Sequence, residues 1–103
     1  MKSADFFIAK AIVCINSIDE ILPNVVSSPF SDETKYAEQS KTLSDLSLKI
    51  KLLFSEFDNG ELFKDKIISI DENKMLWGKR NEVLKQYYDV LSLFIKHINE
   101  FRK

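Results

Sequence analysis

The chain has 103 residues, a formal net charge of −1 and a single cysteine. Its length corresponds to one domain, which can bury an ordinary core without disulfides or metals. The charge argues against a general nucleic-acid binder, because such a protein needs clustered positive charge to displace counterions from phosphates. The lone Cys14 excludes an intrachain disulfide and a multi-cysteine zinc site. Its apolar setting, AIVCI, predicts a buried thiol.

Residue usage favours an all-α fold. Only two glycines and two prolines are present, which are few turn-forming residues for a β-rich chain with many turns. Apolar residues make up 45% and charged residues 30% of the chain, a mixture typical of globular domains. We expect a single domain over residues 1–103, an up-and-down antiparallel helical bundle of three long helices plus one short helix.

The first expected helix contains the apolar segment FFIAKAIVCINSIDEIL, residues 6–22. Ser3 can cap it and Pro23 ends it. A membrane span needs about 20 mostly apolar residues, and a signal peptide needs an uncharged stretch before a small-residue cleavage site. Asp5 and Lys10 interrupt the signal-peptide pattern, and a span is broken by Lys10 and then by Asn16, Ser17, Asp19 and Glu20. We therefore expect a retained, cytosolic protein with no membrane contact. The polar strip is narrow, which predicts a helix covered on most sides, either in the middle of the bundle or partly against another chain, as in a homodimer.

The second expected helix begins near Ser31, where Asp32 and Glu33 suit a first turn. Its apolar positions repeat every seven residues with intermediate members, at Tyr36, Leu43, Leu46, Ile50, Leu53 and Phe57. Three more apolar residues are expected to widen this face: Leu48, Leu52 and Phe54. Asp58, Asn59 and Gly60 form a strong stop signal, with Gly60 available for a left-handed turn.

Residues 61–68 are expected to form a short helix or turn. Ser69 and Glu72 are spaced as in a capping box, which predicts the start of a last helix that runs to about Phe101 and contains Gly78. One apolar row follows this helix, through Val83, Tyr87, Val90, Phe94, Ile98 and Phe101. His97 lies near its end, where a dipole or surface role is expected.

Arg80 and Asn81, followed by Lys85, resemble the Arg-Asn-x3-His motif of the small helical ribonucleases of the HEPN family. Lys85 stands where the family has its histidine, so acid–base chemistry has no obvious agent. The resemblance covers a very small part of the chain, and helical context alone explains the dipeptide. An inactive relative of these ribonucleases is the alternative that it implies.

Acidic residues gather before the last helix, and an aromatic and basic group follows them. We interpret them as a partner-binding surface, because carboxylates attract a basic partner while Trp, Tyr and Arg are enriched in interface hot spots. The candidate residues are Asp58, Glu61, Asp65, Asp71, Glu72, Trp77, Arg80 and Tyr88. The alternative is that the acids are solvated loop charges and that Trp77 packs in the core.

No catalytic signature, cofactor motif or metal-ligand set is recognisable, so an enzyme is not expected. We expect a small cytosolic protein-binding module. The favoured type is an inhibitor or immunity-type protein that neutralises a larger, basic toxin or enzyme by occlusion. Two alternatives stay open: a self-associating scaffold or secretion chaperone that dimerises through the first helix, and the inactive ribonuclease relative.

Overall fold

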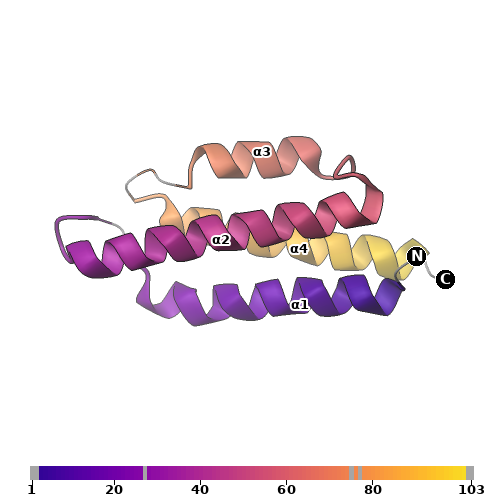
Figure 1. Ribbon diagram of the computed structural model, residues 1–103, viewed down its shortest axis with the longest axis horizontal. Helices are drawn as coiled ribbons and strands as arrows, with labels where there is room; N and C mark the ends of the chain where they lie inside the picture. Colours follow the sequence, from indigo (N-terminus) through magenta and orange to yellow (C-terminus); the bar gives the residue numbers. More distant parts are fainter. Residues whose placement is uncertain (1–2, 27, 75, 77, 102–103) are drawn as a thin grey trace.

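The computed structural model describes residues 3–26, 28–74, 76 and 78–101. These residues form α1 (Ala4–Ile21), the short 3-10 helix η1 (Leu22–Asn24), α2 (Glu33–Asp58), α3 (Lys64–Glu72) and α4 (Arg80–Phe101), with no strand among them. Successive α-helices run in opposite directions, so that α1 begins and α4 ends at the same end of the molecule (Figure 1). The predicted all-α bundle of three long helices and one short helix is confirmed.

The four helices make an elongated bundle that measures 49 × 24 × 18 Å. Figure 1 shows α2 between α1 and α3, with α4 behind it. Aromatic rings join α2 to α4, because the ring centroids of Phe54 and Phe57 lie 4.9 Å and 5.2 Å from that of Phe94. Phe57 also meets Phe7 of α1 at 5.3 Å, so one aromatic cluster joins three helices. Such tilted and edge-to-face contacts add to the free energy of burial.

Helix α1 begins as predicted, because the Ser3 hydroxyl accepts a hydrogen bond from the Phe6 amide at 3.2 Å. It buries one face against α2 and α4, made of Phe7, Ala11, Cys14 and Ile18. The alternative that α1 runs through the middle of its own bundle is wrong, whereas the alternative that part of α1 meets another chain stays a prediction. Ile12 and Val13 are 45% and 55% exposed, because α1 lies at the edge of the bundle and α3 does not reach it.

Helix α2 begins one residue later than expected, since Asp32 is its cap and accepts a hydrogen bond from the Lys35 amide at 3.0 Å. It ends at the predicted stop signal. Both Asn59 and Gly60 adopt left-handed backbone angles, with φ of 62° and 79°. The Asp58 carboxylate holds this turn by accepting hydrogen bonds from the amides of Gly60 and Leu62.

The heptad row of α2 forms the core as predicted, with Leu43, Leu46, Ile50 and Leu53 all buried. Phe54 is buried as well, so the apolar face widens on that side. It does not widen on the other side: Leu48 and Leu52 are 57% and 55% exposed. They lie on the solvent-exposed surface of α2 rather than on the core.

The predicted start of the last helix at Ser69 is wrong. Ser69 lies inside α3, and the chain leaves the helical conformation after Glu72. Ile67 and Ile70 are buried, which places the apolar face of this segment on the core as a separate short helix. Gly78 has a φ of 73° and therefore belongs to the connection rather than to a helix. The capping-box spacing failed as a signal because no continuous helix follows it.

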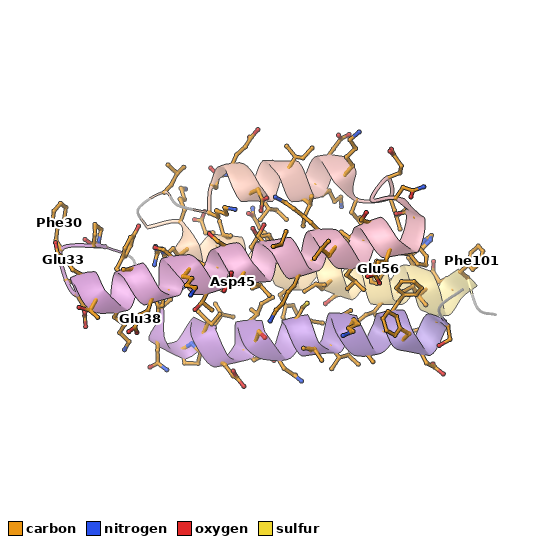
Figure 2. The ribbon with its side chains drawn as sticks, in the orientation of Figure 1. Phe30, Glu33, Glu38, Asp45, Glu56 and Phe101 are labelled. Carbon is orange, nitrogen blue, oxygen red and sulfur yellow. The ribbon has the colours of Figure 1, made fainter. Side chains whose placement is uncertain are left out.

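Helix α4 has the predicted apolar row, in which Val83, Tyr87, Val90, Phe94 and Ile98 are buried. Phe101 is the exception at 82% exposure, because it lies beyond the end of the core (Figure 2). His97 is half-buried, and its ring lies against Phe57 at 5.9 Å and against Phe101 at 6.4 Å.

Candidate protein-binding surfaces

An open groove of about 390 Å³ lies between α3 and α4. Its lining combines charged and polar side chains with apolar ones: Asp65, Lys66, Ser69, Ile70, Gln86, Asp89, Val90 and Leu93. One carboxylate comes from each helix, Asp65 from α3 and Asp89 from α4. Ile70 and Val90 are buried and form the floor, while Leu93 is 40% exposed. We name these lining residues the α3–α4 groove.

Helical spacing places these side chains together. On α3, Asp65 and Ser69 are four residues apart and therefore share one face. On α4, Gln86, Asp89 and Leu93 follow the same rule at three and four residues. The groove thus presents two acids and one base, Lys66, around an apolar floor. This combination suits a basic side chain, whose aliphatic stem packs on apolar surface while its charged head pairs with a carboxylate.

The sequence prediction identified Asp65 but missed Asp89, Gln86 and Leu93. These three stand on one face of α4 at a readable spacing. Nothing in the sequence says that this face, rather than another, lies next to α3, because that juxtaposition is a tertiary contact.

Asp71, another predicted binding residue, has partners inside the molecule. Its Oδ1 accepts a hydrogen bond from the Ser47 hydroxyl at 2.7 Å and a second from the Tyr87 hydroxyl. Its Oδ2 pairs with the Lys51 ammonium. Ser47 and Tyr87 are buried, while the Asp71 side chain is 13% exposed. This carboxylate therefore ties α2, α3 and α4 together.

The cluster shifts the pKa values of its members in opposite directions. Burial acts to raise the pKa of Asp71, but hydrogen bonds from Lys51, Tyr87 and Ser47, together with the Lys51 charge, outweigh burial. The net pKa of Asp71 lies below its ordinary value, and the residue is a carboxylate at neutral pH. Burial, and then the hydrogen bond to Asp71, raise the pKa of Tyr87, which stays a neutral donor.

Arg80 is fully buried at the start of α4. Its Nη1 donates to the Tyr36 carbonyl at 3.1 Å, and its Nη2 donates to the Ser40 hydroxyl. Its guanidinium carbon lies 3.4 Å from the centre of the Tyr36 ring, a cation–π contact. Within the described part of the chain no carboxylate pairs with Arg80, and its Nε has no hydrogen-bond partner. Burial lowers the pKa of this guanidinium, and the Tyr36 contacts partly offset that effect.

The position of Arg80 also bears on the ribonuclease resemblance. Asn81 and Lys85 are exposed on α4, whereas the Arg80 side chain is directed into the core. The three residues of the HEPN-like spacing therefore do not face one common site.

The remaining predicted residues are dispersed. Asp58 holds the turn after α2, and Glu61 and Glu72 are exposed outside the groove lining. Tyr88 is 39% exposed, but it is about 140° from Leu93 around α4 and so faces away from the groove. Trp77 lies outside the described residues. Of the seven predicted residues that the structure describes, only Asp65 lines the α3–α4 groove.

A second groove, of about 420 Å³, lies between α1 and α2. Its lining is more apolar, with charged residues at the rim: Phe6, Lys10, Val13, Cys14, Lys49, Leu52, Leu53 and Glu56. Cys14 lies at the bottom and is 5% exposed. Burial raises the pKa of its thiol, and the nearby Lys49 and Lys10 act against that rise without reversing it. A neutral, buried thiol is a poor nucleophile.

Among the residues that the structure describes, no group of three His, Cys, Asp or Glu side chains is placed to hold a metal ion. None of the described helices combines the length and apolar character needed to cross a bilayer. The chain matches no protein-family model, no curated protein and no solved structure at a significant level.

Proposed function

We propose that this chain is a small cytosolic protein-binding module of the inhibitor or immunity type, which neutralises a larger toxin or enzyme by covering its basic site. The observation that carries the proposal is the α3–α4 groove. It places Asp65 and Asp89 on facing helices above the apolar floor of Ile70 and Val90. An Arg or Lys from the partner fits both parts of this surface.

Charge and apolar contact have separate roles in this mode of binding. The two carboxylates steer a basic partner toward the groove and orient it, an effect that raises the association rate and weakens with salt. Leu93, at 40% exposure, supplies apolar area that a partner side chain can cover. Covering a catalytic or substrate-binding site of the partner then requires no chemistry from this chain.

Affinity capture from the native source, with paired charge-reversal baits, tests the proposal. Asp65→Lys/Asp89→Lys reverses the groove. Asp19→Lys/Glu20→Lys, on the exposed surface of α1, changes the net charge by the same amount elsewhere. We expect a basic protein that binds the wild type and the α1 control, is lost with the groove variant, and is inhibited at a 1:1 ratio. A captured protein that binds all three baits equally, or that keeps its activity when saturated, would contradict the proposal.

One observation favours a second candidate function, a self-associating scaffold or secretion chaperone that dimerises through α1. Ile12 and Val13 leave about half of their surface exposed on this helix. A scaffold built on α1 should be an obligate dimer in sedimentation velocity at low micromolar concentration. A monomer under these conditions would exclude it.

A further inference from the structure

The second groove, named here the α1–α2 groove, combines apolar walls with basic side chains. On α1, Phe6, Lys10 and Val13 follow one another at spacings of four and three residues and therefore share one face. On α2, Lys49 and Leu52 line the groove from the opposite side. The binding surface proposed above lies between α3 and α4, so it does not account for this groove.

The apolar part of the α1–α2 groove is open to solvent. Cys14 and Leu53 form its floor, and each is 5% exposed. Val13 and Leu52 stand on its two walls, and each is 55% exposed. Apolar surface of this kind gains free energy when another apolar group covers it. A narrow apolar chain lying in the groove would touch both walls at once.

Lys49 supplies a free positive charge to this groove. No carboxylate in the described part of the chain forms an ion pair with Lys49 or with Lys10. The charges of both lysines reach the floor, because they act to lower the pKa of the Cys14 thiol. The Lys10 ammonium lies 5.7 Å from the centre of the Phe6 ring, so its charge already rests on an aromatic face. Lys49 is therefore the cation that a ligand can pair with.

The acidic residue of the lining lies at a distance from Lys49. Glu56 follows Lys49 by seven residues, which is two helical turns or about 10.5 Å along α2. It already takes part in an interaction within the molecule. Asp45, one turn before Lys49, does not line the groove. Figure 2 labels these two acids on α2. The Lys49 end of the groove thus favours an anion, and the Glu56 end does not.

The dimensions of the groove indicate a small ligand rather than a helix of another protein. Its lining covers seven residues of α2 from Lys49 to Glu56, or about 10.5 Å. Its volume of about 420 Å³ is near the lower end of the range for small-molecule sites. Three bonds of an extended chain span about 3.3–3.6 Å, so a chain of about eight to ten carbon atoms matches the length of the groove.

We propose that the α1–α2 groove binds a free medium-chain carboxylate of about eight to ten carbon atoms. The carboxylate pairs with the Lys49 ammonium, and the apolar chain lies over Val13 and Leu52 toward the Phe6 ring. The opposite direction would bring the carboxylate to Glu56, which repels it. The site does not depend on the proposed inhibitor function, since the α3–α4 groove lies on other helices.

Titration of the ¹⁵N-labelled full chain with decanoate, kept below the concentration at which it forms micelles, tests the site by NMR. Saturable shifts should appear at the backbone amides of the α1–α2 groove, with a dissociation constant of about 0.1–1 mM for a ligand of about 12 non-hydrogen atoms. Lys49→Glu should weaken binding at least about tenfold, because it reverses the charge that faces the carboxylate. Its matched control, Lys41→Glu, makes the same change on the exposed surface of α2 outside the groove and should bind within about twofold of the wild type.

A second matched pair tests the apolar contact. Leu52→Ser removes apolar area from the groove wall and should weaken decanoate binding about fivefold. Leu48→Ser is its control, because Leu48 is exposed to a similar degree, at 57%, but does not line the groove. Circular dichroism melts verify that each variant is folded.

An exchange of head groups tests the charge assignment. Decyltrimethylammonium has an apolar chain of the same length and a positive head, so it should bind Lys49→Glu more tightly than it binds the wild type, the reverse of decanoate. A wild type without saturable decanoate binding, shifts confined to other surfaces, or equal losses with Lys49→Glu and Lys41→Glu would overturn the proposal. A chain that ignores decanoate but sediments with phosphatidylglycerol vesicles, or binds an acidic helical peptide in this groove, would overturn it as well.

Discussion

Replacing Asp71 with alanine should remove the acceptor that two buried hydroxyl groups share. The hydroxyls of Ser47 and Tyr87 both donate to its Oδ1. A buried donor without an acceptor costs about 1–3 kcal/mol, so the loss of the acceptor of two donors in Asp71→Ala should lower the free energy of unfolding by about 2–6 kcal/mol. The Lys51 contribution is small, because its side chain is 44% exposed and water screens the pair. Tyr87→Phe removes one hydrogen bond to a charged acceptor and should cost about 1.5–3 kcal/mol.

Urea denaturation followed by circular dichroism at neutral pH measures these effects. The stability loss of the double variant Asp71→Ala/Tyr87→Phe should be smaller than the sum of the two single-variant losses by about 1.5–2.5 kcal/mol. The reason is that both single variants remove the same hydrogen bond. Asp65→Ala is the control, an exposed acid of the same helix, and should change stability by less than about 0.5 kcal/mol. Additive losses, within about 0.5 kcal/mol, would refute the shared hydrogen bond.

The same cluster predicts how stability depends on pH. The folded-state pKa of Asp71 lies below its ordinary value, which is about 3.9 in an unfolded chain. Between these two pKa values the unfolded state binds a proton that the folded state does not, so stability rises with pH. The contribution is complete above the unfolded pKa and is lost as the pH falls through the folded pKa. The stability difference between wild type and Asp71→Asn should therefore shrink in denaturation curves taken from pH 7 toward pH 3, whereas a constant or growing difference would count against the assigned hydrogen bonds.

Three further predictions concern single residues. In urea denaturation, Arg80→Lys should destabilise the fold more than Arg80→Met does, by at least about 1 kcal/mol. A buried ammonium loses its hydration and lacks the stacking on Tyr36 and the paired donors that the guanidinium directs at Tyr36 and Ser40. The reverse order of the two variants would contradict this reasoning. Gly78→Ala should lower stability by about 1–2 kcal/mol in thermal melts although open space surrounds the new Cβ, because φ is 73°, and a neutral result would show that the backbone relaxes. Cys14 should react with a thiol reagent only as fast as the chain unfolds, and rapid reaction in native buffer would disprove its burial.

Much of the local structure could be read from the sequence. The Ser3 cap, the stop at Asp58–Gly60 and the buried rows of α2 and α4 followed from residue types and the 3.6-residue period. The prediction failed at Ser69, where a capping-box spacing occurs inside α3. That error has a physical cause: a cap pattern is local, whereas the placement of Ile67 and Ile70 on the core makes this segment a separate helix.

The candidate surfaces were less predictable. Asp71 and Arg80 were predicted to contact a partner protein, but in the fold Asp71 contacts Ser47 and Tyr87, and Arg80 contacts Tyr36. Whether a charged side chain meets solvent or an internal partner depends on residues tens of positions away. The sequence separation between Asp71 and the hydroxyl donors Ser47 of α2 and Tyr87 of α4 contains no signal of that pairing.

The sequence by itself determined most of the secondary structure, but not the break between α3 and α4, because helix periodicity and capping depend on neighbours within a few residues. Only the tertiary structure decided which faces of those helices are covered. Leu53 and Leu52 are adjacent and chemically identical, yet one is 5% and the other 55% exposed. The difference arises because a helix turns about 100° between them, so the packing of α1 and α4 against α2 covers one and leaves the other to solvent.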